Sequence, residues 1–376
     1  METSKSKKVI AAGILVMSMT MACNSALAPI LAEVGKYFPD SSDAAIQIVL
    51  TIINLITLPM MIIEPFFEKV ITKRDIAIIG TALMLVGALV PQVLNTELWM
   101  LYIASGIIGI GLSFVVVTSS SLISDYFSGI DKSRIMGFQS IFVSIGGTTG
   151  YLVFLITVPI ILIILFTVPR GEVIVPEKTE EQSGGISGSM VYFGFLCLIT
   201  GIFVATFNTN IAMYIDAKHI GDANTAGTVS GIMQVVGIIG GLLLGTVVKT
   251  FKRFTIGGSI LVMAAGTACV ALSTNFAVIC VGAFLVGIGF AIRNPGAVTF
   301  GANMVPAAQA SLAIAIISAT YNVGNFLSAF IINPLANMFS TDISMRFLVA
   351  AIGLAIVGIL ACVKAPVTDE QALDAQ

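Results

Sequence analysis

The chain carries two related copies of one sequence pattern, about 178 residues apart. The stretch I-I-G-I-G-L, residues 107–112, returns as L-V-G-I-G-F at residues 285–290. Lys73 and Arg74 of the first copy have their counterparts in Lys252 and Arg253 of the second. A duplication of this length predicts two halves of the same fold, an arrangement in which membrane transporters place their binding site between the halves.

The composition indicates that both copies lie in a membrane. Charged residues make up 10% of the chain and hydrophobic residues 57%, whereas soluble domains carry about 25% charged residues. Apolar runs close to the ~20 residues that cross the hydrocarbon core recur along the sequence. These runs are too long for barrel strands, so we expect an all-α polytopic membrane protein.

The distribution of basic residues predicts the topology. We expect twelve spans, at residues 9–31, 44–66, 75–94, 98–123, 135–150, 152–168, 188–215, 225–248, 255–272, 276–302, 308–332 and 345–363. With a cytoplasmic N-terminus, the inner segments hold 14 of the 18 Lys and Arg residues and the outer segments hold 3, while Arg293 falls inside a span. The positive-inside rule therefore predicts that both termini are cytoplasmic, and we expect the plasma membrane as the location.

Four segments follow from this reading. Residues 1–169 form the N-terminal six-helix half and residues 187–364 the C-terminal six-helix half. Between them, residues 170–186 are charged and rich in glycine and serine, which predicts a cytoplasmic linker. Residues 365–376 form a short acidic tail.

The fifth and sixth spans of the first half are unusually short. Residues 135–168 number 34, whereas the corresponding residues 312–363 number 52. A helix of about 16 residues reaches only ~24 Å, less than the ~30 Å of the hydrocarbon core. We expect either two short, tilted helices that turn at residues 146–150 or a re-entrant hairpin.

Three stretches carry a resemblance to a known family. The loop at residues 64–74, E-P-F-F-E-K-V-I-T-K-R, is similar to the loop after the second span of the major facilitator superfamily, although Glu64 and Ile71 replace its glycines. Residues 125–137 resemble the family's loop between spans four and five. The glycines at 109, 111, 287 and 289 resemble its packing glycines in spans four and ten.

The resemblance implies alternating access, in which two halves rock about a central site. It also implies a cytoplasmic latch in which Glu68 pairs with Arg134 or Lys69, within a gating set that also holds Lys73 and Arg74. Alternatively, Glu68 is an ordinary loop acid. Ser105 stands where proton-linked drug exporters of the family carry an arginine, and residues 146–150 lack their proline, which counts against proton antiport of drugs.

Arg293 is the sharpest candidate for substrate binding. It lies within a predicted span, followed by Asn294 and Pro295. A charge at that depth costs at least ~2.5 kcal/mol and usually faces a cavity or a partner. We expect it to bind an anionic or carbonyl-bearing substrate. The alternatives are an arginine that snorkels to the cytoplasmic interface and one that pairs with Glu64 or Asp125.

Several amides and a tyrosine share the predicted spans with Arg293. Asn24 matches Asn208 across the repeat, and Asn54 matches Gln234 at an offset of 180. Substrate-binding candidates therefore also include Asn24, Asn54, Gln139, Asn208, Gln234, Tyr321, Asn322 and Asn325. Each of them has an alternative role in interhelical hydrogen bonding.

These observations favour a secondary active or facilitative transporter of a small organic solute. Arg293 favours export or exchange of an organic anion or amphipath. Alternatives are a proton-coupled multidrug efflux transporter and a non-transporting sensor or degenerate transporter. No phosphate-binding loop, metal motif or catalytic triad is present, so we expect no enzyme activity, cofactor or metal. Expected partners are the solute, the lipid bilayer and a coupling proton, with no nucleic acid, around a monomer.

Overall fold

The computed structural model describes residues 7–22, 27–68, 70–127, 135, 138–139, 141–146, 156–169, 188–305 and 310–369. All the regular structure in these residues is helical, which confirms the all-α expectation for this part of the chain. Seven described stretches are long and apolar enough to cross a membrane. The total of twelve spans and the cytoplasmic position of the termini stay predictions.

The helices divide into two compact units. Residues Met1–Leu27 and Ile48–Glu180 form the first unit, and Ala28–Gln47 and Glu181–Gln376 form the second. The segment 28–47, which runs from the last residues of the first predicted span into the beginning of the second, thus packs with the C-terminal part of the sequence. The boundary predicted at residue 169 stays a prediction, because the linker 170–186 lies outside the described residues.

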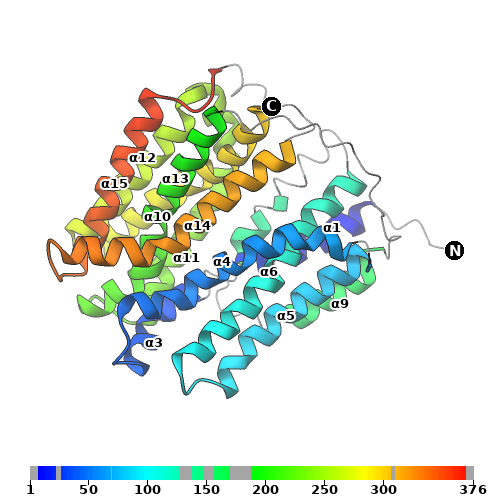
Figure 1. The fold of residues 1–376 in the computed structure, drawn as a ribbon, viewed down its shortest axis with the longest axis horizontal. Helices are drawn as coiled ribbons and strands as arrows, with labels where there is room; N and C mark the ends of the chain where they lie inside the picture. Colours follow the sequence, from blue (N-terminus) through cyan, green and yellow to red (C-terminus); the bar gives the residue numbers. More distant parts are fainter. Residues whose placement is uncertain are drawn as a thin grey trace. The chain divides into compact units, whose positions relative to one another are not determined.

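The first unit is built around a helical hairpin. Helix α5 lies along α6, and α9 packs against α1 and α5 (Figure 1). Buried aliphatic side chains such as Ile14, Ile53, Val115 and Ile164 fill the space between these helices. The bounds are α1 Lys7–Ser18, η1 Met19–Ala22, α4 Asp43–Phe67, α5 Lys73–Val93, α6 Leu98–Tyr126 and α9 Thr157–Thr167.

The second unit is a bundle in which each long helix has at least one close neighbour. Helix α10 packs along α14, and α12 packs along both α13 and α15, while α11 packs along α13 (Figure 1). The bounds are η2 Ala28–Ile30, α3 Leu31–Tyr37, α10 Gly188–Ala217, α11 Ala223–Phe251, η3 Lys252–Phe254, α12 Thr255–Leu272, α13 Phe276–Asn303, α14 Ala310–Asn337 and α15 Ser344–Val363.

The sequence repeat reappears as a repeat of helix contacts. A Cβ atom added at Gly111 would lie 2.5 Å from the carbonyl oxygen of Gly80, and one added at Gly289 would lie 2.6 Å from that of Ser259. The glycines two residues earlier, Gly109 and Gly287, each face a different neighbouring helix. At Gly109 the added atom would lie 2.8 Å from the carbonyl oxygen of Ile53, and at Gly287 2.6 Å from that of Met233.

In each unit, one glycine of the pair therefore permits close approach to one neighbouring helix, and its partner permits approach to another. Small residues at helix contacts let backbones come together in membranes, where apolar burial does not drive association. The expected role of these glycines in packing is confirmed by these distances. The equivalence of Ile53 and Met233 also places Asn54 and Gln234 at matching positions.

Local signals set the ends of the helices in the second unit. Asp222 accepts the backbone N–H of Thr225 at 3.0 Å, while the Thr225 hydroxyl accepts that of Asp222, forming a capping box for α11. Helix α10 ends at Ala217, and His219, two residues on, has a positive φ of 53°. The N–H of Ile220 donates to Ile215 and that of His219 to Asp216, as in a Schellman motif. His219 is exposed and lies in the turn that follows α10.

The short hairpin of the first half is described only in part. Helix α9 has 11 residues, or about 16 Å, and is thus shorter than the hydrocarbon core. Residues 141–146 are helical, but the turn predicted at 146–150 falls almost wholly outside the described residues. Whether this region forms two tilted helices or a re-entrant hairpin stays a prediction.

Candidate functional site

Arg293 lies deep in the second unit, on α13, with 1% of its surface exposed. Its guanidinium carbon stands 4.5 Å from the centre of the Tyr321 ring on α14. The thiol of Cys197, on α10, lies beside the same guanidinium. Three helices therefore converge on one buried cation. The snorkelling alternative is wrong, because the side chain does not reach a surface.

Two of the nitrogen atoms of Arg293 are not satisfied by the protein. Both Nε and Nη2 are buried and have no hydrogen-bond partner among the described residues. The alternative partners proposed from the sequence are engaged within the first unit. Glu64 accepts the hydroxyl of Thr118 at 3.0 Å, and Asp125 accepts Lys73 at 2.6 Å. Arg293 therefore carries unmet donors in an enclosed setting.

Close helix packing fixes the ring above Arg293. A Cβ atom at Gly201 would lie 2.4 Å from the carbonyl oxygen of Tyr321, and one at Gly324 would lie 2.1 Å from that of Leu198. These glycines let α10 and α14 approach at the level of the tyrosine. Asn325 donates its side-chain N–H to the same carbonyl at 3.0 Å. Tyr321 and Asn325 are thus held at the wall beside the arginine.

The remaining amide candidates are spread over the two units. Gln139 donates to the hydroxyls of Ser18 and Ser119 at 3.2 and 2.9 Å, so it ties together elements of the first unit. This contact supports the interhelical alternative for Gln139. Asn54, Asn208, Gln234 and Asn322 are half-buried, and Asn294 is exposed. Asn24 lies outside the described residues.

A polar network that sequence reasoning did not identify lies elsewhere in the second unit. Gln47 donates to Asn210 at 2.7 Å, and Asn333 donates to Gln47 at 3.0 Å. Arg346 donates to the same oxygen of Asn210 at 3.0 Å and also binds Asp43. All except Asp43 are buried. The network fastens residues 43–47, the beginning of α4 that belongs to the second unit, to α10, α14 and α15.

An open cavity of about 530 Å³ adjoins this network and is lined by Asp43, Arg346, Lys36 and Asp216 among others. Lys36 bridges to Asp216 at 2.6 Å on its wall. A signal for the network was present in the sequence, since Gln47, Thr51 and Asn54 lie on one face of the second predicted span at a spacing of i, i+4 and i+7. The partners of Gln47 are 163 and 286 residues away and carry no local signal.

The gating candidates form contacts within the first unit. Lys73, at the start of α5, lies 2.6 Å from Asp125 at the end of α6 and 3.9 Å from Glu68. Arg74 lies 3.7 Å from Asp75. Lys69 and Arg134, the partners expected for Glu68, lie outside the described residues. The latch with Glu68 stays a prediction, and Asp125 joins its candidate members.

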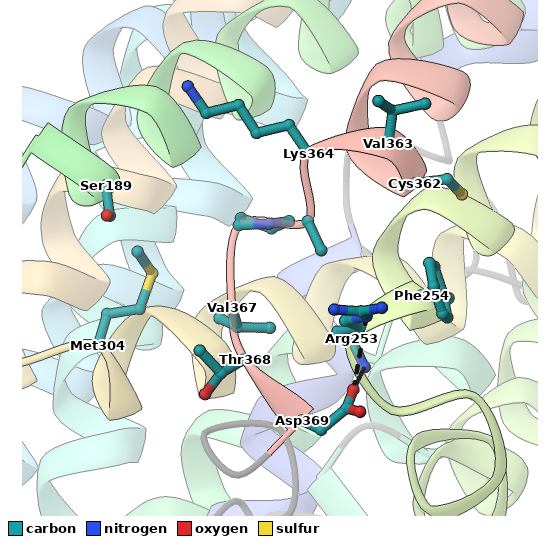
Figure 2. Close-up of a pocket in the computed structure, with 12 residues that line it drawn as sticks. Ser189, Arg253, Phe254, Met304, Cys362, Val363, Lys364, Val367, Thr368 and Asp369 are labelled. Atoms are coloured by element: carbon teal, nitrogen blue, oxygen red, sulfur yellow. Dashed lines mark hydrogen bonds and ion pairs between the residues drawn. The ribbon is translucent and has the colours of Figure 1, made fainter.

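A larger cavity of about 780 Å³ lies at the end of the second unit where α15 finishes. Figure 2 shows Arg253 and Asp369 facing each other on its wall, with Lys364 on the segment that follows α15. The Arg253 Nε atom is 3.8 Å from the Asp369 carboxylate. Arg293 is not among its lining residues. In the described part of the chain, no cluster of three or more His, Cys, Asp or Glu residues suits a metal ion.

The apolar helices and the glycine contacts repeated in the two units indicate a multi-pass membrane protein with an internal repeat. The chain belongs to the Major Facilitator Superfamily, whose family model matches residues 10–181 and 191–375. It is thus a transporter and not an enzyme. No curated protein matches the sequence.

Solved structures of transporters share this fold. The nucleoside transporter NupG aligns with a TM-score of 0.71 and 14% identity, covering 93% of this chain and 98% of that one. A bacterial homologue of the human lysosomal transporter Spinster, inward-facing and unoccupied, gives 0.72 and 14%, covering 100% and 99%. The POT family transporter PepTSo gives 0.75 and 10%, covering 96% and 98%. At these identities the likeness establishes the fold alone.

Proposed function

We propose that the protein is a secondary transporter that moves a small organic solute by alternating access, with its substrate site around Arg293. The observation that carries this proposal is the pair of buried nitrogen donors on that side chain that find no partner in the described part of the chain. An arginine that served only to hold helices together would direct these donors at helix carbonyls or at an acid. Donors that the protein leaves open are available to a ligand.

The energetic cost of this arrangement supports a functional role. Placing a charge at the depth of a membrane span costs at least ~2.5 kcal/mol, and each buried donor left unsatisfied costs about 1–3 kcal/mol more. Such a cost persists in a fold when the group has a task that requires it. We therefore assign Arg293 and Tyr321 to the substrate site. Asn294, Asn322, Asn325, Asn208, Gln234, Asn54 and Asn24 stay candidate contributors.

Topology and location complete the proposal. The excess of basic residues in the expected inner segments supports cytoplasmic termini, in a plasma membrane protein with twelve spans. We infer an organic anion or amphipath as the solute, moved outward or by exchange, and a monomer as the working unit. The gating set of Glu68, Lys69, Lys73, Arg74 and Arg134 is assigned to the cytoplasmic closure.

One observation favours proton coupling as a second candidate function. Glu64 is buried, its Oε1 atom accepts only the hydroxyl of Thr118, and its Oε2 atom has no partner among the described residues. The charged groups near it are Glu68 and Lys73, and Lys73 is bound to Asp125. A carboxyl in such a setting suits reversible protonation.

The test is counterflow of labelled solutes in proteoliposomes that contain the full-length protein. We expect uptake with at least one solute class, and a loss of at least tenfold with Arg293→Ala. Lys249→Gln removes a positive charge from an exposed position of α11 and serves as the matched control. If no solute of any class moves, although specific binding is detected, the protein is a sensor and the proposal is wrong.

The variant Glu64→Gln tests proton coupling. We expect its counterflow activity to continue, whereas its uptake driven by a pH gradient should stop.

A further inference from the structure

We infer that the solute bound at Arg293 carries a single carboxylate, held side-on by the Nε and Nη2 atoms of the guanidinium. This inference rests on the proposed function and names the substrate class of the same site. The inference is based on the identity of the two guanidinium nitrogen atoms that have no hydrogen-bond partner among the described residues. Only Nε and Nη2 are buried without a partner.

The geometry of the guanidinium makes this pair of atoms specific. Nη1 lies on the same side as the Cδ atom, so the N–H of Nε and one N–H of Nη2 point in parallel along the opposite edge. Two parallel donors in one plane match the two oxygen atoms of a carboxylate, which forms a bidentate pair. A single carbonyl oxygen would satisfy only one of them. The open edge of Arg293 thus has the form of a carboxylate receptor.

The charge of the site calls for an anion from outside the protein. The described residues of the second unit include seven acids, namely Glu33, Asp40, Asp43, Asp216, Asp222, Asp342 and Asp369. They lie on the short helix α3, at helix ends or in loops, and none lies within α13 or α14. Four of them bind other cations, since Asp43 pairs with Arg346, Asp216 with Lys36, Asp342 with Lys218 and Asp369 with Arg253.

The same count of charges sets the charge of the ligand. The other Lys and Arg residues described in the second unit lie on α3, near helix ends or in the connections between helices, away from the middle of α13. One cation in an apolar setting is neutralised by one negative charge, and a second negative charge would stay unpaired at high cost. A monocarboxylate therefore fits better than a dicarboxylate or a phosphate monoester.

The walls beside the arginine indicate an apolar body for the solute. The ring of Tyr321 covers one face of the guanidinium, and the centre of the Phe290 ring lies 6.4 Å from the centre of the Tyr321 ring. Tyr321 and Phe290 pack on a cluster that includes Phe193, Cys197 and Phe300. A carboxylate that enters this region brings its carbon skeleton against aromatic and aliphatic surface, where burial of apolar area favours binding.

The binding test uses the full chain purified in detergent and a panel of matched probes. Butyrate and benzoate should raise the melting temperature and bind, whereas butyramide, benzamide, phenyl phosphate and benzylamine should not. Arg293→Lys keeps the charge but removes the planar fork, so we expect it to weaken benzoate binding about tenfold or more. Lys249→Gln should bind benzoate like the parent.

A second test needs no ligand. Arg293→Met replaces an unpaired buried cation by an apolar side chain of similar length, so the unliganded protein should melt at a higher temperature while it loses benzoate binding. An arginine with a structural role predicts the opposite, a lower melting temperature or failure to fold, and either result would overturn the inference.

The outcomes separate this inference from the proposed function. If amides, amines or sugars bind and are transported, and Arg293→Lys leaves them unaffected, the carboxylate assignment is wrong and the transporter assignment stands. If phenyl phosphate binds more tightly than benzoate, the single-charge argument is wrong. Transport of no solute of any class in proteoliposomes would remove the proposed function, and the inference with it.

Discussion

The side-chain amide of Gln47 donates to the amide oxygen of Asn210 at 2.7 Å, across 163 residues of sequence. The same oxygen accepts the guanidinium of Arg346 at 3.0 Å. Asn210 thus serves two buried donors, while its own N–H groups bind the Thr206 carbonyl and the Thr209 hydroxyl. Its side chain is the centre of the network that joins the beginning of α4, residues 43–47, to α10, α14 and α15 within the second unit.

Replacing Asn210 should destabilise the protein strongly. Asn210→Ala leaves one N–H of Gln47 and one of Arg346 without an acceptor, and each buried orphan costs about 1–3 kcal/mol. We expect a loss of roughly 2–4 kcal/mol in the free energy of unfolding, measured by denaturant titration in detergent. Asn208→Ala, at a half-buried position on the same helix, should cost much less. Equal losses in the two variants would show that the network adds no stability.

The close approach of α10 and α14 should not tolerate a methyl group. Gly324→Ala would place its Cβ 2.1 Å from the carbonyl oxygen of Leu198, so the two helix backbones would have to separate. We expect a loss of about 1–3 kcal/mol. Because Tyr321 lies one turn away, ligand binding should weaken as well.

The matched control is Gly227→Ala on α11, where an added Cβ meets nothing within 4 Å. There alanine should stabilise the protein by roughly 0.5–1 kcal/mol, because its backbone loses less conformational entropy on folding than that of glycine. Melting temperatures of the two variants should therefore move in opposite directions, and a fall of the same size in both would contradict the packing argument.

Lys252 lies in the turn between α11 and α12 with φ 47° and ψ −124°. A side chain is unfavourable in this conformation, which glycine adopts readily. Lys252→Gly should therefore stabilise the protein by about 1 kcal/mol. Lys249→Gly, which also removes a lysine but lies within α11, should destabilise it by about 1 kcal/mol. Thermal unfolding of both variants measures the difference in sign.

The link between Asp342 and Lys218 predicts a dependence of stability on pH. The Lys218 ammonium donates to Asp342 at 2.6 Å and the backbone N–H of Ser344 donates at 2.8 Å, which lowers the pKa of Asp342 from 3.8 to about 2. Because the folded pKa is below the unfolded one, this stabilisation is present above about pH 4 and disappears as the pH falls toward 2.

Asp342 is half exposed, so the effect should stay below ~1 kcal/mol. Asp342→Asn should melt slightly below the parent at pH 6, and the difference should close between pH 4 and pH 2.5. A difference that is constant over this range would mean that the charge of Asp342 does not contribute.

Much of the helix pattern follows from the sequence. The predicted spans 255–272 and 276–302 agree with α12 and α13 to within one residue, and 44–66 agrees with α4 to within one residue at each end. Long apolar runs bounded by polar residues define such helices, because the hydrocarbon core sets their length. The predicted span 9–31 is different, since α1 ends at Ser18 and 3₁₀ turns follow.

The polar network was not predicted because its signal is not local. The repeat pointed to Asn208, yet the deeply buried amide is Asn210, two residues on and about 160° away around the helix. In a soluble helix the polar side identifies the exposed face. A membrane helix is apolar toward both the lipid and the protein, so its pattern does not tell which face is buried.

Arg293 was found from the sequence because a charge within an apolar run is rare on any face. The sequence indicated only that Arg293 and Tyr321 both lie in predicted spans, and it did not indicate that the two side chains are in contact. The side of the guanidinium that stays open depends on rotamers and on the approach of three helices, and no sequence pattern reports these.

The paired glycines of α6 and α13 limit how far the two copies in this chain can diverge from each other. A duplicated gene can change every side chain that faces lipid or solute, but not a position where a neighbouring carbonyl occupies the place of a Cβ. These glycines therefore occur in both copies of the repeat. Arg293, in contrast, corresponds to Val115 in the first copy. The two copies can thus share their helix contacts, while the residue that we assign to substrate binding occurs in only one of them.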